Sequence, residues 1–125
     1  MHKNVLIVDD NNDIRAIISM KLEAAGIKVR EAVNGADALT KLEAQKPDLL
    51  VLDVDMPVKD GMETLHDIRE NKDLKDLKVV FLTSYGNAHD MSVDTQLAKD
   101  LGAAGYLHKT DDLENLSKSI LEYLK

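Results

Sequence analysis

The residues of this sequence that could carry chemistry lie at the ends of short apolar runs. Carboxylates offer hard oxygen ligands, hydroxyls offer hydrogen bonds, and a lysine offers a compact positive charge. A carboxylate that follows a strand is most often a helix cap or a turn residue, so one such position alone indicates little. Here the pattern recurs along the chain: Asp9 and Asp10 follow the run Asn4–Val8, Asp53 follows Leu49–Leu52, Thr83 and Ser84 close the run that begins at Lys78, and Lys109 follows Gly105–His108.

If these side chains share one cleft, their charges decide what else the cleft must hold. Two carboxylates roughly 4 Å apart repel each other by about 4 kcal/mol at an effective dielectric constant near 20. A site rich in oxygen ligands and without thiolates suits Mg²⁺ or Mn²⁺, which leave positions for water and phosphate oxygens. A carboxylate beside such an ion and a lysine can attack an electrophilic phosphorus atom to form an aspartyl phosphate. The residue types therefore predict a site for a divalent cation and a phosphoryl group.

The apolar runs alternate with segments of helical periodicity, which predicts a repeating strand–helix order. The first, third and fourth runs are nearly continuous, as expected for strands covered on both faces. The run Lys28–Ala32 alternates polar and apolar residues instead, which places it at an edge of the sheet. We therefore expect a single doubly wound α/β domain with a five-stranded parallel sheet and helices on both faces. In such a sheet, ligands bind beyond the carboxyl ends of the strands, where the strand order reverses.

Cap residues and apolar spacing predict five helices. The first has Asn12 or Asp13 as its expected N-cap and ends before Gly26. The last begins with a capping-box pattern formed by Asp111 and Glu114. The first helix carries its apolar pattern at residues 14–22, and the later helices are expected over about residues 35–44, 61–71, 92–101 and 112–124.

The composition narrows the classes of function. The chain of 125 residues has the size of one domain, and 16 basic against 23 acidic residues give a formal net charge of −7. This charge opposes direct binding to nucleic acid or to an anionic membrane surface. The absence of cysteine excludes disulfides, thiolate metal sites and cysteine nucleophiles. No segment approaches the ~20 apolar residues that a membrane span needs, so we expect a cytoplasmic protein without membrane insertion.

Taken together, the motifs resemble the receiver domain of response regulators, the CheY-like family of two-component signalling, whose fold is flavodoxin-like. The similarity covers essentially the whole chain. It implies a stand-alone receiver domain over residues 1–125, without an output domain. The motifs that carry it are Val5–Asp10, Leu50–Pro57 with Asp60–Gly61, Phe81–Ser84 and Gly105–Lys109.

The resemblance assigns the acidic residues to phosphoryl transfer. It implies that Asp53 is the phosphoacceptor and that Asp10 and Asp53 ligate Mg²⁺, or Mn²⁺, with help from the backbone carbonyl of Asp55. It implies that Asp9 acts through water or as an outer ligand.

The resemblance also implies how the signal leaves the site. Thr83 is expected to donate a hydrogen bond to one phosphoryl oxygen and Lys109 to pair with another, while Thr83 and Tyr106 form the switch. Such a domain takes its phosphoryl group from a histidine kinase or phosphotransfer protein and changes its surface for a downstream effector protein. It acts as a monomer or a phosphorylation-dependent dimer. It is a signalling phosphoacceptor that catalyses its own phosphorylation and dephosphorylation, not an enzyme with an external substrate.

Three positions depart from the family pattern. Thr110 stands where the family usually has a proline, so the Lys109–Thr110 bond is expected to be trans. Position 55 is acidic, although family members vary there. The stretch between Thr83 and Lys109 is expected to be a few residues longer than in short family members, with the insertion at Gly86–Asp90.

Two other functions fit part of the pattern. The segment Asp53-Val54-Asp55 resembles the signature of haloacid-dehalogenase-type phosphatases, with Thr83 and Lys109 as later motifs. In those enzymes the signature follows the first strand and the acidic pair comes late, which is the reverse of the order here. The second alternative is a degenerate receiver that serves only as an interaction module, but the acidic pair, Asp53 and Lys109 are all present.

Overall fold

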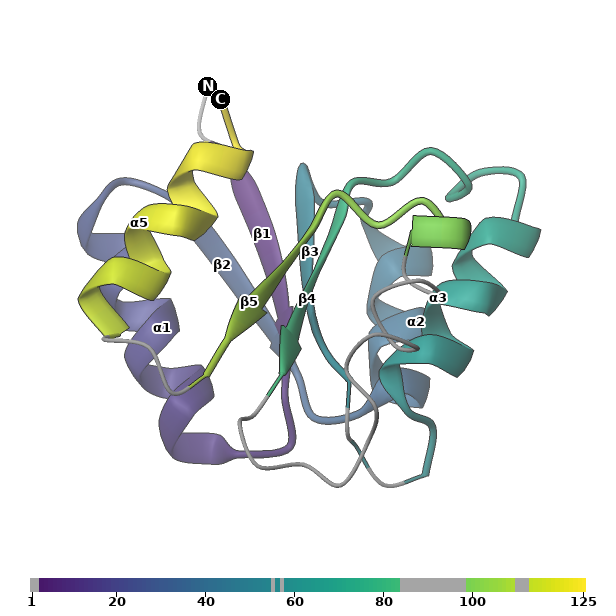
Figure 1. Ribbon diagram of the computed structural model, residues 1–125, viewed down its shortest axis with the longest axis horizontal. Coiled ribbons are helices and arrows are strands. Elements are labelled where there is room, and N and C mark those ends of the chain that lie inside the picture. The colour runs from purple at the N-terminus through teal and green to yellow at the C-terminus, as the bar shows by residue number, and fades with distance from the viewer. Residues whose placement is uncertain (1–2, 55, 57, 84–98, 110–112) are drawn as a thin grey trace.

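The computed structural model describes residues 3–54, 56, 58–83, 99–109 and 113–125 of the chain. Its strands form one parallel sheet in the order β2-β1-β3-β4-β5 (Figure 1). The strands are β1 (Asn4–Val8), β2 (Lys28–Ala32), β3 (Leu49–Asp53), β4 (Val79–Thr83) and β5 (Gly105–His108), and the helices with defined bounds are α1 (Asn12–Ala24), α2 (Gly35–Ala44), α3 (Gly61–Glu70) and α5 (Leu113–Tyr123).

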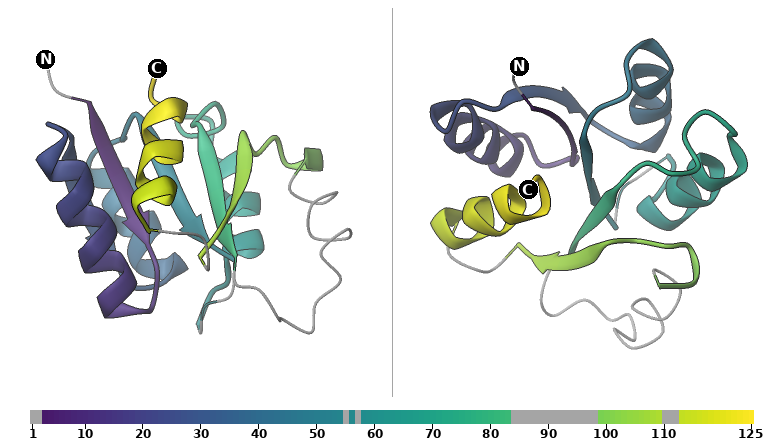
Figure 2. Two further views of the ribbon diagram at one scale, coloured as in Figure 1. Left: turned by 60° about the vertical axis from the view of Figure 1, so that its left-hand side comes forward. Right: turned by 90° about the horizontal axis from the view of Figure 1, so that it is seen from above.

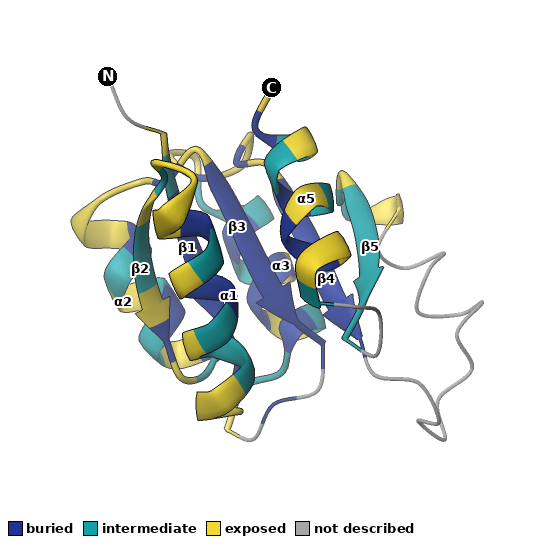
Figure 3. Cartoon of the chain, turned by 90° about the vertical axis from the view of Figure 1, so that its left-hand side faces the viewer, coloured by how far each residue is buried: buried dark blue, intermediate teal, exposed yellow. Residues whose placement is uncertain are grey.

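The predicted α/β architecture is confirmed. Helices α1 and α5 cover one face of the sheet, and α2 and α3 cover the other (Figures 1 and 2). Strand β2 lies at an edge, as its alternating sequence predicts, and its first four residues are exposed or half-buried. In contrast, β3 and β4 are buried along their whole length (Figure 3). No helix within the described ranges is both long and apolar enough to cross a membrane.

Each buried strand contributes to two hydrophobic cores because successive side chains point to opposite faces. Along β3, Leu50 and Leu52 pack with α2 and α3, whereas Leu49 and Val51 pack with α1 and α5. All four side chains are fully buried. The continuous apolar runs of the sequence therefore serve both layers at once, and this anchors the carboxyl end of each strand in a rigid frame.

Local capping sets the entry into the helices at this edge of the sheet. The N-cap of α1 is Asn11, whose side chain accepts hydrogen bonds from the backbone N–H groups of Asp13 and Ile14. The expectation of Asn12 or Asp13 was wrong by one or two residues, because the chain turns directly after the acidic pair. Helix α3 begins with a capping box between Asp60 and Glu63, which was not among the features predicted from the sequence.

Two predicted helices lie partly outside the described residues. Of the helix expected over 92–101, residues 92–98 lie outside the described part of the chain, while Lys99 and Asp100 are helical. Asp111, the expected cap of the last helix, also lies outside, and α5 itself is described from Leu113 to Tyr123.

Arg69, near the end of α3, forms hydrogen bonds with the two loops that precede β4 and β5. Its guanidinium donates hydrogen bonds to the carbonyl oxygens of Leu101 and Gly102, before β5, and of Lys75 and Leu77, before β4. The distances run from 2.6 to 3.0 Å. This arginine therefore positions the start of β5, the strand that leads to Lys109.

Val58, in the loop after β3, has a backbone conformation that valine rarely adopts. Its φ is +72°, in the left-handed region, and its side chain is 82% exposed. For a β-branched residue this conformation costs about 1–2 kcal/mol, because Cβ crowds the following carbonyl oxygen. The loop that follows Asp53 is therefore strained at this position.

We predict that Val58→Gly raises the free energy of unfolding by about 0.5–1 kcal/mol, because glycine adopts a positive φ without strain and loses little buried surface here. Chemical denaturation monitored by circular dichroism measures the change. Val33→Gly is the matched control, since Val33 is also exposed but has no positive φ, and it should lower the unfolding free energy. A loss of stability in both variants would contradict the assignment of strain to Val58.

Candidate functional site

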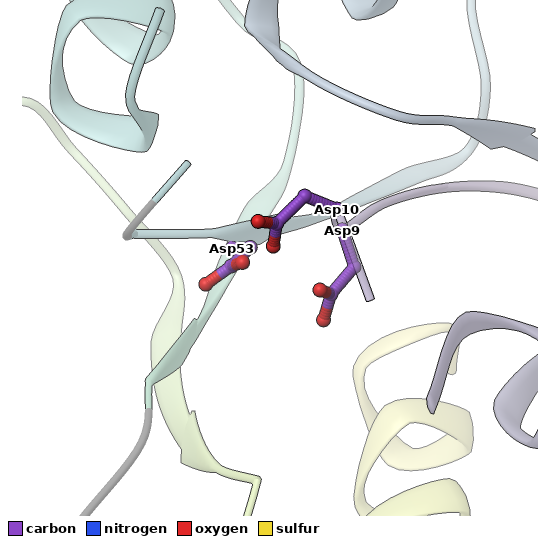
Figure 4. A group of neighbouring side chains, drawn as sticks. All are labelled: Asp9, Asp10 and Asp53. Carbon is purple, nitrogen blue, oxygen red and sulfur yellow. The ribbon is translucent and has the colours of Figure 1, made fainter. Parts of the chain in front are cut away.

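The strand register brings the predicted site residues to one edge of the sheet. Val8 of β1 pairs with Leu52 of β3, so the acidic pair that follows β1 lies beside Asp53. This is where the strand order reverses, because β2 and β3 flank β1 on opposite sides. Figure 4 shows Asp9 and Asp10 from one strand end and Asp53 from the next, with their carboxylates gathered in one place.

The three carboxylates form a group that can hold a metal ion. Asp9, Asp10 and Asp53 each offer an oxygen, and these atoms lie within 4.8 Å of one another. Asp9 and Asp53 are buried, while Asp10 is exposed and its carboxylate has no hydrogen-bond or ion-pair partner among the described residues. A cluster of hard oxygen ligands with one uncommitted carboxylate fits a divalent cation such as Mg²⁺ or Mn²⁺. The predicted carbonyl ligand, Asp55, lies outside the described residues.

Lys109 balances the buried charge of the group. Its Nζ lies 2.9 Å from Oδ2 of Asp53 and 2.9 Å from Oδ2 of Asp9, and its side chain is only 9% exposed. Its backbone N–H donates to the carbonyl oxygen of Thr83 at 2.7 Å, which fixes the residue just beyond the end of β5. The sequence prediction placed Lys109 near Asp53, but it did not foresee the second contact to Asp9.

These contacts change the pKa of Lys109. Burial by itself lowers the pKa of an ammonium group, because the charged form loses solvation. Hydrogen bonds and charge attraction from Asp53 and Asp9 more than offset this effect, so the pKa of Lys109 lies above its ordinary value of 10.5. The lysine is therefore charged at neutral pH and remains so beside its two carboxylates.

Both carboxylate oxygens and the backbone N–H of Asp9 have partners in the protein, which distinguishes Asp9 from Asp10. Its Oδ1 accepts a hydrogen bond of 2.9 Å from the backbone N–H of Asn11, while its Oδ2 contacts Lys109. Its backbone N–H donates to the carbonyl oxygen of Ala32 at 3.2 Å. Asp9 therefore has little freedom to move toward a ligand, whereas Asp10 is free to bind one.

Gly61 explains why the segment after Asp53 can approach the site so closely. A Cβ atom at this position would lie 2.4 Å from the carbonyl oxygen of Asp53 and 2.9 Å from Cα of Val54. The Gly61 N–H also donates to the carbonyl oxygen of Val54 at 2.9 Å. Any larger residue would push the acceptor strand and α3 apart, so the Asp60–Gly61 motif has a direct steric cause.

The predicted switch residues occupy neighbouring strands. Thr83 is buried at the end of β4, and Tyr106 is half-buried on β5. The ring of Tyr106 packs against Phe81, its partner in the β4–β5 register, with ring centroids 5.7 Å apart. Ser84, the expected insertion at residues 86–90 and Thr110, with the Lys109–Thr110 bond, lie outside the described residues.

Comparison with known proteins shows the family. The family model of the response regulator receiver domain matches residues 5–121, and the chain therefore belongs to this family. Sporulation initiation phosphotransferase F of Bacillus subtilis is 32% identical over 99% of the chain and 95% of its own length. The alkaline phosphatase synthesis transcriptional regulatory protein PhoP of the same species is 38% identical over 87% of the chain, which spans only 43% of PhoP.

Solved structures agree with this assignment. Chemotaxis protein CheY4 of Vibrio cholerae superposes with a TM-score of 0.86 at 31% identity, over 98% of this chain and 99% of CheY4. The phosphorylated cyanobacterial phytochrome response regulator RcpA gives 0.86 at 29% identity, over 99% and 94%. The Mn²⁺-bound response regulator Rcp1 gives 0.79 at 29% identity, over 96% and 90%. The flavodoxin-like, CheY-like fold and the identification as a two-component receiver are thus confirmed, and receivers of this family are signalling phosphoacceptors.

The contacts of Lys109 generate a prediction about pH. Because its pKa is higher in the folded chain than the ordinary 10.5, its contribution to stability is complete below about pH 10.5 and is lost as the pH rises through the folded value. Asp53→Asn removes one of the two attracting carboxylates, so we expect it to lower the pKa of Lys109. Nuclear magnetic resonance titration of the Lys109 Cε signal without divalent metal measures both values. An unchanged midpoint in the variant would show that Lys109 and Asp53 do not pair in solution.

Proposed function

We propose that this chain accepts a phosphoryl group on Asp53 from a histidine kinase or a phosphotransfer protein, in a reaction that needs Mg²⁺ or Mn²⁺. The observation that carries this proposal is the bridge of Lys109 to Asp53 and Asp9, at 2.9 Å each, beside the uncommitted carboxylate of Asp10. A nucleophile, a cation and a set of metal ligands therefore share one site. The phosphorylated RcpA and the Mn²⁺-bound Rcp1 are members of the same structural class, which supports both parts of the proposal.

In this reaction Asp53 is the nucleophile. One of its carboxylate oxygens forms a bond to the phosphorus atom of a phosphohistidine, and the phosphorus–nitrogen bond breaks. The electron pair leaves with the imidazole nitrogen of the donor. The imidazole departs neutral because it takes up one proton from water, either on its other nitrogen before the transfer or on the freed nitrogen after it. Asp10 and Asp53 would hold a divalent cation, with the predicted backbone carbonyl of Asp55 as a further ligand and Asp9 as an outer one, and the bound ion would supply charge neutralisation for the transferring oxygens.

Lys109 and Thr83 serve the phosphoryl group once it has arrived. The ammonium group of Lys109 has three donors, so it can contact a phosphoryl oxygen without leaving Asp9. The Thr83 hydroxyl donates to another phosphoryl oxygen. The same groups hold the acyl phosphate while water attacks phosphorus and the phosphorus–Asp53 bond breaks, so the chain also catalyses its own dephosphorylation.

Phosphorylation of Asp53 is expected to change the surface of the protein near β4 and β5. Phosphorylation adds about −1.5 to −2 charges and three acceptor oxygens at Asp53. Movement of Thr83 toward these oxygens alters the space beside Tyr106, whose ring packs on the neighbouring Phe81. A downstream effector protein reads the altered surface, and the receiver acts in the cytoplasm as a monomer or as a phosphorylation-dependent dimer.

The geometry of the site disfavours one alternative function, a degenerate receiver without phosphotransfer. A module without phosphotransfer has no need for two buried carboxylates in contact with a buried lysine, because burying charges costs free energy unless they are paired. The phosphatase of haloacid-dehalogenase type fails on chain order, since the described sheet places Asp53 at the end of the third strand.

We predict that small phosphodonors label this chain only when Mg²⁺ or Mn²⁺ is present, because the acidic group needs a counter-charge to accept an anion. Intact-mass measurement after incubation with acetyl phosphate or phosphoramidate should show a gain of one phosphoryl group, and a chelator should abolish it. Asp53→Asn should take up none. Asp10→Ala should stay folded and lose most of its metal affinity, and Lys109→Ala should bind metal but label slowly.

Equal labelling with and without divalent metal would refute the proposed site. Rapid release of phosphate without a stable adduct, in contrast, would indicate a phosphatase, and no labelling under any condition would indicate an interaction module.

We predict that the switch is confined to β4 and the segment through β5. Amide hydrogen exchange with and without beryllofluoride should change most in peptides that cover Thr83 to Lys109, because Thr83 supplies the contact that differs between the two states. Thr83→Ala should reduce this change and still allow labelling of Asp53. Changes centred instead on residues 14–43 would contradict the switch and leave the acceptor assignment intact.

A further inference from the structure

Arg15, in the first turn of α1, makes three hydrogen bonds, one of which goes to the residue that follows β1. Its Nη1 donates to the backbone carbonyl oxygen of Asp9 at 2.7 Å, its Nε contacts Oε1 of Glu31 at 2.8 Å, and its Nη2 donates to Oδ1 of Asn12 at 2.7 Å. The side chain is 12% exposed. A single guanidinium thus links the end of β1, strand β2 and the start of α1.

The hydrogen bond from Arg15 to the Asp9 carbonyl oxygen matters because the next residue, Asp10, has no side-chain hydrogen bond or ion pair of its own among the residues that the structure describes. The carboxylate of Asp10 has no hydrogen-bond or ion-pair partner in the described part of the chain, so no side-chain contact there holds it toward Asp53. Its direction depends on the backbone that carries it. The Asp9 carbonyl and the Asp10 N–H belong to one planar peptide unit, so a bond that holds this carbonyl also sets where Cα of Asp10 lies.

The contacts of Asp9 leave this carbonyl as the remaining point of control. Its backbone N–H, its Oδ1 and its Oδ2 contact Ala32, Asn11 and Lys109, respectively. These bonds fix the residue before the peptide unit, and Arg15 fixes the peptide unit itself. Without Arg15 the plane can rotate, and the carboxylate of Asp10 would sample positions away from Asp53.

We propose that Arg15 is a positioning residue for the divalent-cation site, holding the Asp9–Asp10 peptide so that the carboxylate of Asp10 faces Asp53. This proposal rests on the proposed metal dependence of the site and assigns part of its affinity to a residue that does not touch the ion. Only arginine can fill the role, because its planar fork reaches three acceptors at once, whereas the single ammonium of lysine is a point charge.

Charge alone predicts the opposite effect, which makes the proposal testable. A positive side chain close to a cation site repels the cation, so removing that charge should strengthen binding if Arg15 acts only through its charge. Loss of a positioning bond should weaken binding instead, typically by about tenfold or more for a partner that orients a metal ligand. Arg15→Lys separates the two effects, since it keeps the charge and loses the geometry.

The experiment measures Mn²⁺ binding by electron paramagnetic resonance and Mg²⁺ binding by calorimetry, without any phosphodonor. We expect Arg15→Lys and Arg15→Gln each to weaken binding about tenfold. Glu31→Gln is the matched control, because it removes the ion-pair partner and leaves the bond to the Asp9 carbonyl; it should change the affinity less than twofold. Circular dichroism and a denaturation curve establish that each variant is folded under the binding conditions.

A second readout does not depend on metal. Amide exchange at Asn11, whose N–H donates to Oδ1 of Asp9, should speed up in Arg15→Lys and not in Glu31→Gln. Metal affinity equal to wild type in Arg15→Lys, or tighter binding in Arg15→Gln, overturns the role of Arg15 and leaves the proposed function standing. Absence of Mn²⁺ and Mg²⁺ binding to the wild-type chain overturns the proposed function, and the Arg15 proposal with it.

Discussion

Two carboxylates and one lysine meet in a buried position at the carboxyl edge of the sheet, and the rest of the site is arranged around their charge balance. Asp9, Asp53 and Lys109 come from the ends of three different strands and are nearly inaccessible to solvent. Removing one partner from such a group typically costs about 3–5 kcal/mol, because it leaves a buried charge uncompensated. The ion bridge therefore joins the ends of β1, β3 and β5 at the carboxyl edge of the sheet.

The surrounding structure serves this bridge through backbone contacts more than through further charges. Gly61 lets the start of α3 lie against the backbone of Asp53, and the N–H of Asn11 fixes one oxygen of Asp9. Arg69 joins the loops that precede β4 and β5, so that β5 enters the sheet at a defined place. Lys109 then receives its own backbone bond from the end of β4. Strands β4 and β5 also share the Phe81–Tyr106 ring contact.

The two adjacent carboxylates of the acidic pair show how position decides chemistry. Asp9 directly follows β1, whose last four residues are buried, and uses every polar group in bonds to the protein, whereas Asp10 lies one residue further, at the surface. Asp9 therefore acts as part of the frame, and Asp10 is available to an ion. The strained backbone of Val58 lies between a buried strand, β3, and the capped start of α3.

The sequence by itself determined the fold class, the edge position of β2 and the edge of the sheet at which the predicted site residues lie. Continuous apolar runs mark strands covered on both faces, and parallel strands bring their carboxyl ends to one edge, so Asp9, Asp10, Asp53, Thr83 and Lys109 could be placed together without coordinates. Only the tertiary structure decided which side chains pair. The contact of Lys109 with Asp9, the reach of Arg15 to the Asp9 carbonyl and the four bonds of Arg69 join residues from separate elements. Their partners depend on side-chain direction and strand register, which cannot be derived from the spacing of residues along the sequence. The N-cap at Asn11 shows the same limit at short range, because the turn directly after the acidic pair depends on where β1 ends in the sheet and not on the preferences of the residues that follow it.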